Sequence, residues 1–196
     1  MDMQIIPTIC ERDPLVAEAR WGQIKETTRW VQVDVFDGVF SYGKSFDLEL
    51  VEKIISDQDR LVDVHLMVSK PVGWVEKCIG VGASRIIGQV EMMANQNEFI
   101  KKVKEERLEV GLAFDVETEV GEIPKGVDVI LLMARKAGFE PKELDERVWK
   151  KIERAKKWGV KIGVDGGVRK EHLARLEEAG VSIAYVGEEY LNIVNE

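Results

Sequence analysis

Short apolar runs recur along the chain and alternate with segments in which apolar residues recur every three or four positions. Runs rich in Val, Ile and Leu that end at turn residues are typical of strands in a buried sheet. Eight runs fit this description: 4–9 (QIIPTI), 30–36 (WVQVDVF), 61–68 (LVDVHLMV), 84–91 (SRIIGQVE), 109–115 (EVGLAFD), 127–133 (VDVILLM), 160–165 (VKIGVD) and 182–187 (SIAYVG).

Amphipathic helical patterns lie between most of these runs. The clearest cover 48–55, 72–82, 97–107, 144–159 and 170–180. Asp13-Pro14 and Asn95 are typical helix starts, and Gly82, Gly159 and Gly180 are typical left-handed helix ends. The segment 116–126 (VETEVGEIPKG) is weak and is expected to hold only a short turn.

A steady alternation of strand and helix predicts a parallel sheet, and eight units close a (β/α)8 barrel. No linker rich in Pro, Gly or Ser divides the 196 residues, so we expect one barrel domain over 1–196. The length is near the short limit for this fold. A doubly wound open sheet is the alternative.

Alternation within the strands indicates which side chains point into the barrel. Successive residues of a strand point to opposite faces, so Val31, Val33 and Val35 suit the helix layer. The opposite face then carries Gln32, Asp34 and Phe36 in the second strand, Asp63, His65 and Met67 in the third, and Lys161, Gly163 and Asp165 in the seventh. Polar groups are therefore expected to converge at the carboxyl ends of three strands, where barrel enzymes place their chemistry.

Composition narrows the range of partners. The chain is 45% hydrophobic and 33% charged with a net charge of -8, which fits a globular protein and argues against a general nucleic-acid or anionic membrane surface. No apolar run is long enough to span a bilayer, and the N-terminus carries an acid where a signal peptide has basic residues. We expect a cytoplasmic protein with Cys10 and Cys78 as reduced thiols.

A second motif competes with the barrel interpretation. Gly38 to Ser45 fits the P-loop pattern G-x-x-x-x-G-K-[ST], which cradles nucleotide phosphates. A phosphate cradle favours small residues, whereas Phe40 and Tyr42 are large, and Asp47 is a better helix cap than the Lys-Ser pair. The P-loop is therefore the weaker interpretation, and Asp37 and Gly38 are expected to turn the chain after the second strand.

Five segments resemble the ribulose-phosphate 3-epimerase family in order and spacing: WVQVDVFDG, VDVHLMV, VDVILLM, GVDGGV and AYVG. The resemblance covers nearly the whole chain. It implies a (β/α)8 barrel that interconverts D-ribulose 5-phosphate and D-xylulose 5-phosphate. It also implies a small sugar phosphate or related ketose as the partner, and association into homo-oligomers.

The resemblance assigns acid/base and metal roles to residues of this chain. Asp34 and Asp165 become the acid/base pair, because inverting a carbon next to a carbonyl requires a base and an acid on opposite faces. The same two residues and His65 would bind one divalent cation, Mn, Fe, Co, Zn or Mg, which stabilises the enediolate. Gln32 stands where the family has a further His ligand, and Gln89 replaces another family His. An amide oxygen binds transition metals more weakly than imidazole does.

The resemblance also assigns substrate-binding positions, and the residues expected to bind the phosphate group differ from those of the family. Met67 and Met133 match the family's cap over the intermediate, with Phe36 at the third such position. The remaining positions are Thr8, Gly138, Gly166, Gly167 and Gly187, with Arg135 and Lys136 as compensating charges. Glu140 and Pro141 interrupt the glycine-rich loop, and Glu188 would repel phosphate. Two alternatives follow: a barrel acting on an unphosphorylated sugar or keto acid, and a barrel that binds a ligand without turnover.

Overall fold

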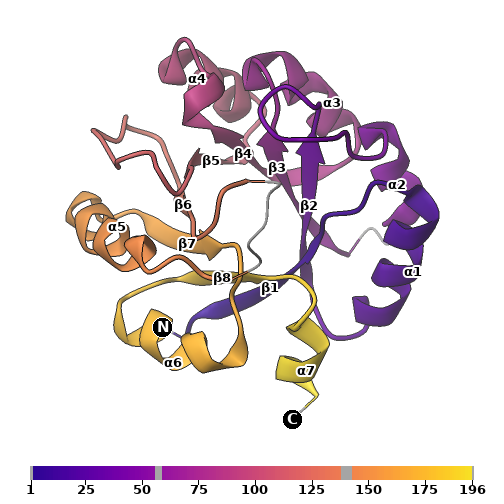
Figure 1. Cartoon of the computed structure of the whole chain (residues 1–196). Helices are drawn as coiled ribbons and strands as arrows, with labels where there is room; N and C mark the ends of the chain where they lie inside the picture. The colour runs from indigo at the N-terminus through magenta and orange to yellow at the C-terminus, as the bar shows by residue number, and fades with distance from the viewer. Residues whose placement is uncertain (1, 56–58, 138–142, 196) are drawn as a thin grey trace.

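The computed structural model describes residues 2–55, 59–137 and 143–195, and its eight parallel strands form a closed barrel (Figure 1). Each strand pairs with its neighbour in chain order, and β1 also pairs with β8, which excludes the open sheet. The strands are β1 (Gln4–Ile9), β2 (Trp30–Phe36), β3 (Leu61–Met67), β4 (Ala83–Gln89), β5 (Glu109–Phe114), β6 (Val129–Met133), β7 (Lys161–Asp165) and β8 (Ile183–Val186).

Helices surround the barrel in the expected order. They are α1 (Pro14–Ile24), α2 (Val51–Ile54), α3 (Val75–Gly80), α4 (Gln96–Glu105), α5 (Arg147–Ala155), α6 (Lys170–Glu178) and α7 (Tyr190–Val194). Residues 115–128, between β5 and β6, form turns and no helix, as the weak pattern predicted. Among the described residues, no helix is long and apolar enough to cross a membrane.

Several predicted helix ends are confirmed. The side chain of Asp13 accepts a hydrogen bond from the Leu15 amide at the start of α1, and that of Asn95 accepts one from Asn97 at the start of α4. The backbone of Gly82, Gly159 and Gly180 is left-handed, with φ of 77°, 64° and 82°. These conformations are accessible to glycine at little cost, so the glycines end the preceding helical segments.

The predicted helices 48–55 and 72–82 are wrong in detail. Each begins as a 3₁₀ segment, Leu48–Leu50 and Pro71–Trp74, and only then becomes a short α-helix. In the second case Pro71 lacks an amide donor. The predicted strand 84–91 ends at Gln89, because Val90–Met92 form another 3₁₀ turn. These differences lie at the ends of strands or in the segments that follow them.

Two separate apolar layers confirm the predicted alternation of side chains. The outer layer contains Val31, Val33 and Val35 of β2, packed beneath the helices. The inner layer contains Phe36, Met67 and Met133 and fills part of the barrel interior. The remaining inward positions near the carboxyl ends of the strands carry the polar groups of the candidate site.

Candidate active site

Asp34 and Asp165 come together at the carboxyl end of the barrel from strands β2 and β7. The carboxamide nitrogen of Gln32, also on β2, donates to both, at 2.9 Å from Asp34 Oδ1 and 2.8 Å from Asp165 Oδ2. Gln32 and Asp34 face the same way because they are two positions apart on one strand, with Val33 between them. Alternation along β2 therefore directs Gln32 and Asp34 into the barrel, where they meet Asp165 from a distant part of the chain.

His65 completes the cluster from β3, where it lies in register with Asp34. Its Nδ1 lies 3.0 Å from Asp34 Oδ1 and 3.7 Å from Asp165 Oδ2. Its other ring nitrogen, Nε2, lies 3.2 Å from the carboxamide of Gln89. Gln89 satisfies all its partners when its oxygen accepts from Nε2 and its nitrogen donates to Glu91 and to the Ala113 carbonyl. In that arrangement Nε2 carries a proton and Nδ1 is directed at the carboxylates.

Burial and neighbouring charges shift the pKa values of two groups in this cluster. Burial, followed by the negative charge of Asp34, raises the pKa of Asp165 to about 6. Burial alone would lower the pKa of His65, but the hydrogen bond that the ring can donate to Asp34 and the charges of the nearby carboxylates outweigh it, so the pKa is raised. The pKa values of both Asp165 and His65 are thus raised, that of Asp165 to about 6.

The donor atoms of this cluster fit a divalent cation. Asp34, His65 and Asp165 each offer one ligand atom, and these atoms lie within 4.8 Å of one another. Two carboxylate oxygens and one imidazole nitrogen are a common donor set for such ions. Gln89 would orient the imidazole, as partners of metal-bound histidines generally do. Gln32 presents its nitrogen, not its oxygen, to this position.

A cavity of about 680 Å³ opens above the acid pair. Its volume is in the usual range for a small-molecule site. The predicted residues on its wall are Thr8, Asp34, Arg135, Asp165, Gly166, Gly167 and Gly187. Gln32 and His65 are fully buried, and Met67 and Met133 belong to the inner apolar layer. The exposed Lys136 is not on the wall, and Gly138 lies outside the described residues.

The turn after β7 contains two glycines, and the first of them, Gly166, lies close to Arg135. Gly166 and Gly167 have φ of 105° and 67°, which favour glycine. A Cβ on Gly166 would lie 2.6 Å from Cγ of Arg135. The guanidinium group of Arg135 also acts on Asp165, where its charge favours the ionised carboxylate. A positive side chain therefore lies on the cavity wall near Asp165 and the turn after β7.

Sequence reasoning missed several residues of the cavity wall. Three more arginines, Arg12, Arg20 and Arg169, line it together with Glu11, Cys10, Tyr42, Tyr185 and Glu189. Glu188, which was expected to repel phosphate, also lies on the wall. Arg20, on α1, donates to the Gly187 carbonyl at 2.5 Å. Arg12 and Arg169 follow β1 and β7 by a few residues, and this position after a strand end could have indicated that they line the cavity. Arg20 gave no such signal, because it lies within a helix.

Cys10, which directly follows β1, is a further group near the acids. Water reaches it in the cavity, although protein atoms surround the thiol on its other sides. Desolvation, together with the charges of Asp34 and Asp165, raises the pKa of this thiol well above its ordinary value. Cys10 is therefore a protonated, weakly nucleophilic thiol at neutral pH.

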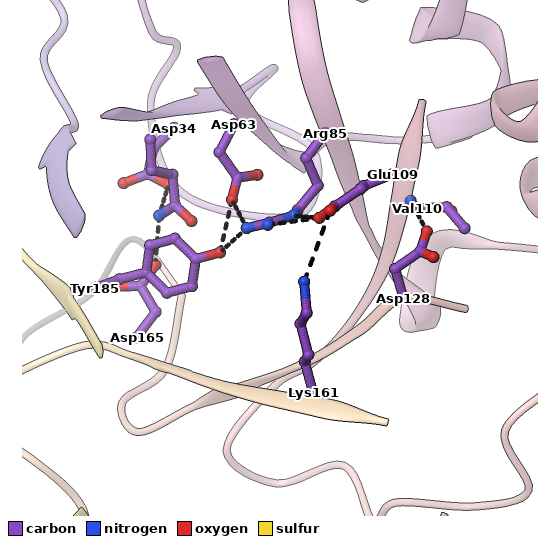
Figure 2. Close-up of polar contacts among 10 residues, drawn as sticks. Asp34, Asp63, Arg85, Glu109, Val110, Asp128, Lys161, Asp165 and Tyr185 are labelled. Atoms are coloured by element: carbon purple, nitrogen blue, oxygen red, sulfur yellow. Dashed lines mark hydrogen bonds and ion pairs between the residues drawn. The ribbon is translucent and has the colours of Figure 1, made fainter. Parts of the chain in front are cut away.

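A second buried polar network, separate from the hydrogen bonds of the acid pair, includes Asp63, Arg85 and Tyr185 (Figure 2). Asp63 accepts hydrogen bonds from Arg85 Nη1 at 2.8 Å and from the Tyr185 hydroxyl at 2.6 Å. Arg85 also contacts Glu109, whose carboxylate lies 3.7 Å from Lys161 Nζ. Asp63 and Arg85 are at most 1% exposed. This network supports the barrel interior beneath the site.

The segment Gly38–Ser45 does not form a phosphate cradle. No helix begins at Lys44 or Ser45, and the next helical turn starts at Leu48. The Ser45 amide donates to the Phe36 carbonyl, so this residue closes a loop after β2. Asp37 accepts hydrogen bonds from the amide and hydroxyl of Ser69 at 2.8 and 2.7 Å, which ties the loop to the end of β3. The P-loop interpretation is therefore rejected.

Comparisons with known proteins place this geometry in a family. The model of the ribulose-phosphate 3 epimerase family matches residues 4–190. A ribulose-phosphate 3-epimerase of Chlamydia muridarum is 30% identical over 164 residues, covering 78% of this chain and 72% of that protein. A Bacillus subtilis protein of the same name is 28% identical over 199 residues, covering 94% and 90%.

Solved structures agree on the fold. A mutant tryptophan synthase alpha-subunit from Pyrococcus furiosus superposes with a TM-score of 0.71 at 16% identity, covering 99% of this chain and 91% of that one. At this identity the likeness concerns the barrel alone. Because the family model spans nearly the whole chain, we conclude that the protein belongs to the ribulose-phosphate 3-epimerase family of carbohydrate epimerases.

Proposed function

We propose that this protein inverts C3 of a ketose 5-phosphate, interconverting D-ribulose 5-phosphate and D-xylulose 5-phosphate, with Asp34 and Asp165 as the acid/base pair. The observation that carries the proposal is the position of the two carboxyl groups. They come from strands β2 and β7, converge on the same Gln32 nitrogen, and both line the 680 Å³ cavity. A substrate above them would place its reacting carbon within reach of both acids.

The proposed reaction needs two proton transfers at one carbon. One carboxylate removes the C3 proton, and the electron pair of the broken C–H bond moves toward the C2 carbonyl, whose oxygen becomes the enediolate oxygen. The other carboxylic acid then gives a proton to C3 from the opposite face. The raised pKa of Asp165, about 6, suits a group that must hold a proton part of the time at neutral pH. The roles of the two residues exchange in the reverse direction.

Asp34, His65 and Asp165 would hold the divalent cation that the family implies. When bound, such an ion supplies positive charge that stabilises an enediolate. His65 would present Nδ1 to it, with Gln89 fixing the ring from the other side. Phe36, which lines the cavity, and the buried Met67 and Met133 give the interior an apolar character that keeps water from the intermediate.

The anionic end of the substrate would meet the loops after β7 and β8. Gly166, Gly167 and Gly187 line that part of the wall, with the hydroxyl-bearing Thr8 nearby and Arg135 as the charged partner. Guanidinium groups bind phosphate oxygens through several N–H donors at once. With Arg12, Arg20 and Arg169, four arginines border a cavity that also carries three glutamates. Their presence favours an anionic substrate despite Glu188.

A second candidate is an unphosphorylated ketose. Glu188 and Glu189 lie on the wall where the phosphate group is expected. Carboxylates there would repel phosphate and would accept hydrogen bonds from a neutral sugar hydroxyl group. This candidate retains Asp34 and Asp165 as the acid/base pair and changes only the recognition of the far end. A barrel that binds without turnover remains the third outcome of the test below.

The test compares D-ribulose 5-phosphate with D-ribulose, using the protein supplied in turn with Mn, Fe, Co, Zn or Mg. Product formation is followed by NMR, with Asp34→Asn as the matched control. The proposal predicts conversion of the phosphate ester at a kcat/KM about 100-fold or more above that of the free sugar. Preference for D-ribulose would support the second candidate. No conversion of either compound, with binding retained, would contradict both.

A further inference from the structure

The Gln32 carboxamide lies at the centre of the acid pair in an arrangement that leaves one of its own atoms unsatisfied. Its Nε2 donates to Asp34 Oδ1 and Asp165 Oδ2, which uses both N–H groups of the amide. Its Oε1 is buried and has no hydrogen-bond partner among the described residues. The side chain is 0% exposed, so water does not reach it from outside. A buried amide oxygen without a partner costs free energy.

The two carboxylate oxygens bound by Gln32 are the same two that His65 faces. Nδ1 of His65 lies 3.0 Å from Asp34 Oδ1 and 3.7 Å from Asp165 Oδ2. A cation held by His65 and these acids would be coordinated by the two carboxylate oxygens that now accept hydrogen bonds from Gln32. The amide N–H groups and a cation therefore compete for one position. The amide N–H groups and a cation cannot share this position, because the positive end of the N–H dipole would repel the ion.

Rotation of the carboxamide by half a turn reverses this relationship. Oε1 would then face Asp34 and Asp165, which is repulsive while the site holds only carboxylates and favourable once a divalent cation lies between them. The rotated oxygen would also gain the partner that it now lacks. The orientation of the Gln32 amide is thus linked to occupancy of the cation site.

We propose that Gln32 is a cation-dependent latch. In the metal-free protein its N–H groups hold Asp34 and Asp165 together, and binding of a divalent cation requires the amide to release both carboxylates and turn its oxygen toward the ion. The latch keeps the acid pair organised without a cation, and it weakens cation binding by the two charge-assisted hydrogen bonds that must break. Gln32 is a positioning residue, since it acts through the two acids.

This inference rests on the proposed cation site but not on turnover, so it is tested by binding and spectroscopy. Mn²⁺ and Co²⁺ are titrated by calorimetry into the wild-type protein, Gln32→Leu, Gln32→Glu and Gln23→Leu. Gln23 is exposed on α1 and serves as the matched control. Circular dichroism confirms that each variant is folded. Gln32→Glu keeps the shape of the side chain and also lacks the amide, so it replaces Gln32→Leu in the amide measurement below if Gln32→Leu fails to fold.

The latch predicts tighter binding when it is removed. Gln32→Leu deletes the two competing hydrogen bonds and should bind Co²⁺ about tenfold or more tightly than the wild type. Gln32→Glu adds a third carboxylate and should bind more tightly still, while Gln23→Leu should match the wild type. Binding in Gln32→Leu that equals or falls below that of the wild type would overturn the latch, as would an absence of cation binding in every variant.

A second readout follows the amide itself. In ¹⁵N-labelled protein, the Gln32 side-chain NH₂ resonances are assigned by their absence from Gln32→Leu and followed during titration with diamagnetic Zn²⁺. The latch predicts that both N–H resonances shift strongly as the site fills, because their carboxylate acceptors are lost. Resonances that stay in place at saturating Zn²⁺ would show that the amide does not turn. Epimerase assays run in parallel keep a failure of turnover distinct from a failure of the latch.

Discussion

Nε2 of Gln32 lies 2.8 Å from Oδ2 of Asp165, although 133 residues separate them in the sequence. Their strands, β2 and β7, do not pair, since β1 and β8 lie between them in the barrel wall. The contact therefore crosses the barrel interior. Its geometry depends on closure of the whole barrel, so the acid pair is assembled only when the fold is complete.

We expect Arg135 to bind the anionic end of the substrate. Arg135→Gln removes a guanidinium group that lines the cavity beside Gly166. Loss of one charge-assisted contact of about 1.5–3 kcal/mol should raise KM for D-ribulose 5-phosphate by roughly 10- to 100-fold, with a smaller change in kcat. Steady-state kinetics measure both constants.

The control for Arg135 is Arg29→Gln, because Arg29 is exposed just before β2 at the opposite end of the barrel. That variant should keep the wild-type KM. An unchanged KM in Arg135→Gln would remove this side chain from the proposed anion site and favour the unphosphorylated substrate.

Gly166 is expected to tolerate no side chain. Gly166→Ala forces a Cβ into a φ of 105° and to within 2.6 Å of Arg135 Cγ. Strain of this kind costs about 1–3 kcal/mol, so chemical denaturation should show a lower free energy of unfolding, together with weaker substrate binding as Arg135 moves.

Gly22→Ala is the matched control, since a Cβ there meets nothing within 4 Å and the position lies inside α1. It should stabilise the protein by about 0.5–1 kcal/mol. Equal stability of the two alanine variants would mean that the turn after β7 adapts without strain.

The buried Arg85 is expected to be essential to stability. Arg85→Met leaves Asp63, which is 0% exposed, without its ionic partner. Breaking a buried pair in this way costs about 3–5 kcal/mol. Tyr185→Phe removes one hydrogen bond to Asp63 and should cost about 1–3 kcal/mol.

Lys161→Met tests the exposed end of the same network. Its ion pair with Glu109 spans 3.7 Å and its side chain is 56% exposed, so the change should alter the free energy of unfolding by less than about 1 kcal/mol. Denaturant titrations of the three variants should rank them in that order, and a loss at Lys161 as large as that at Arg85 would contradict it.

The barrel was predictable because its signals are local. Alternation within β2, β3 and β7 separated the helix-facing valines from Gln32, Asp34 and His65, and this separation is what the structure shows. The predicted helices 48–55 and 72–82 were less accurate, because short segments at barrel ends take 3₁₀ geometry from their surroundings.

The cavity was only partly predictable. Asp34, Asp165 and the glycines after β7 follow strand ends, and their positions could be expected from the sequence. Arg20 could not, because it reaches the Gly187 carbonyl from a helix 167 residues away in sequence. The hydrogen bonds of Gln32 to two strands were likewise invisible, since they depend on side-chain orientation across the closed barrel.

Lys151 should make stability depend on pH. It is 4% exposed, and its Nζ donates to the Phe114 and Asp115 carbonyls. Burial lowers the pKa of its ammonium group to about 8 in the folded protein. Between that value and about 10.5 the unfolded chain binds more protons than the folded one, so the free energy of unfolding rises with pH.

Lys151→Met should lack this rise in the free energy of unfolding with pH. The free energy of unfolding of the wild type, relative to the variant, should increase by about 2 kcal/mol from pH 7.5 to pH 10. The neighbouring exposed Lys150, changed to Met, should show no such trend. A constant difference between wild type and Lys151→Met across this range would contradict the lowered pKa.

The most direct test of the two-aspartate account is exchange of the C3 proton with solvent. D-Ribulose 5-phosphate is incubated in D₂O with the wild type, Asp34→Asn or Asp165→Asn, with each divalent cation in turn, and deuterium at C3 is followed by NMR. The account predicts exchange in the wild type and a loss of about 10³-fold in each folded variant. Exchange that persists in both variants, or its absence from the wild type with every cation, would contradict it.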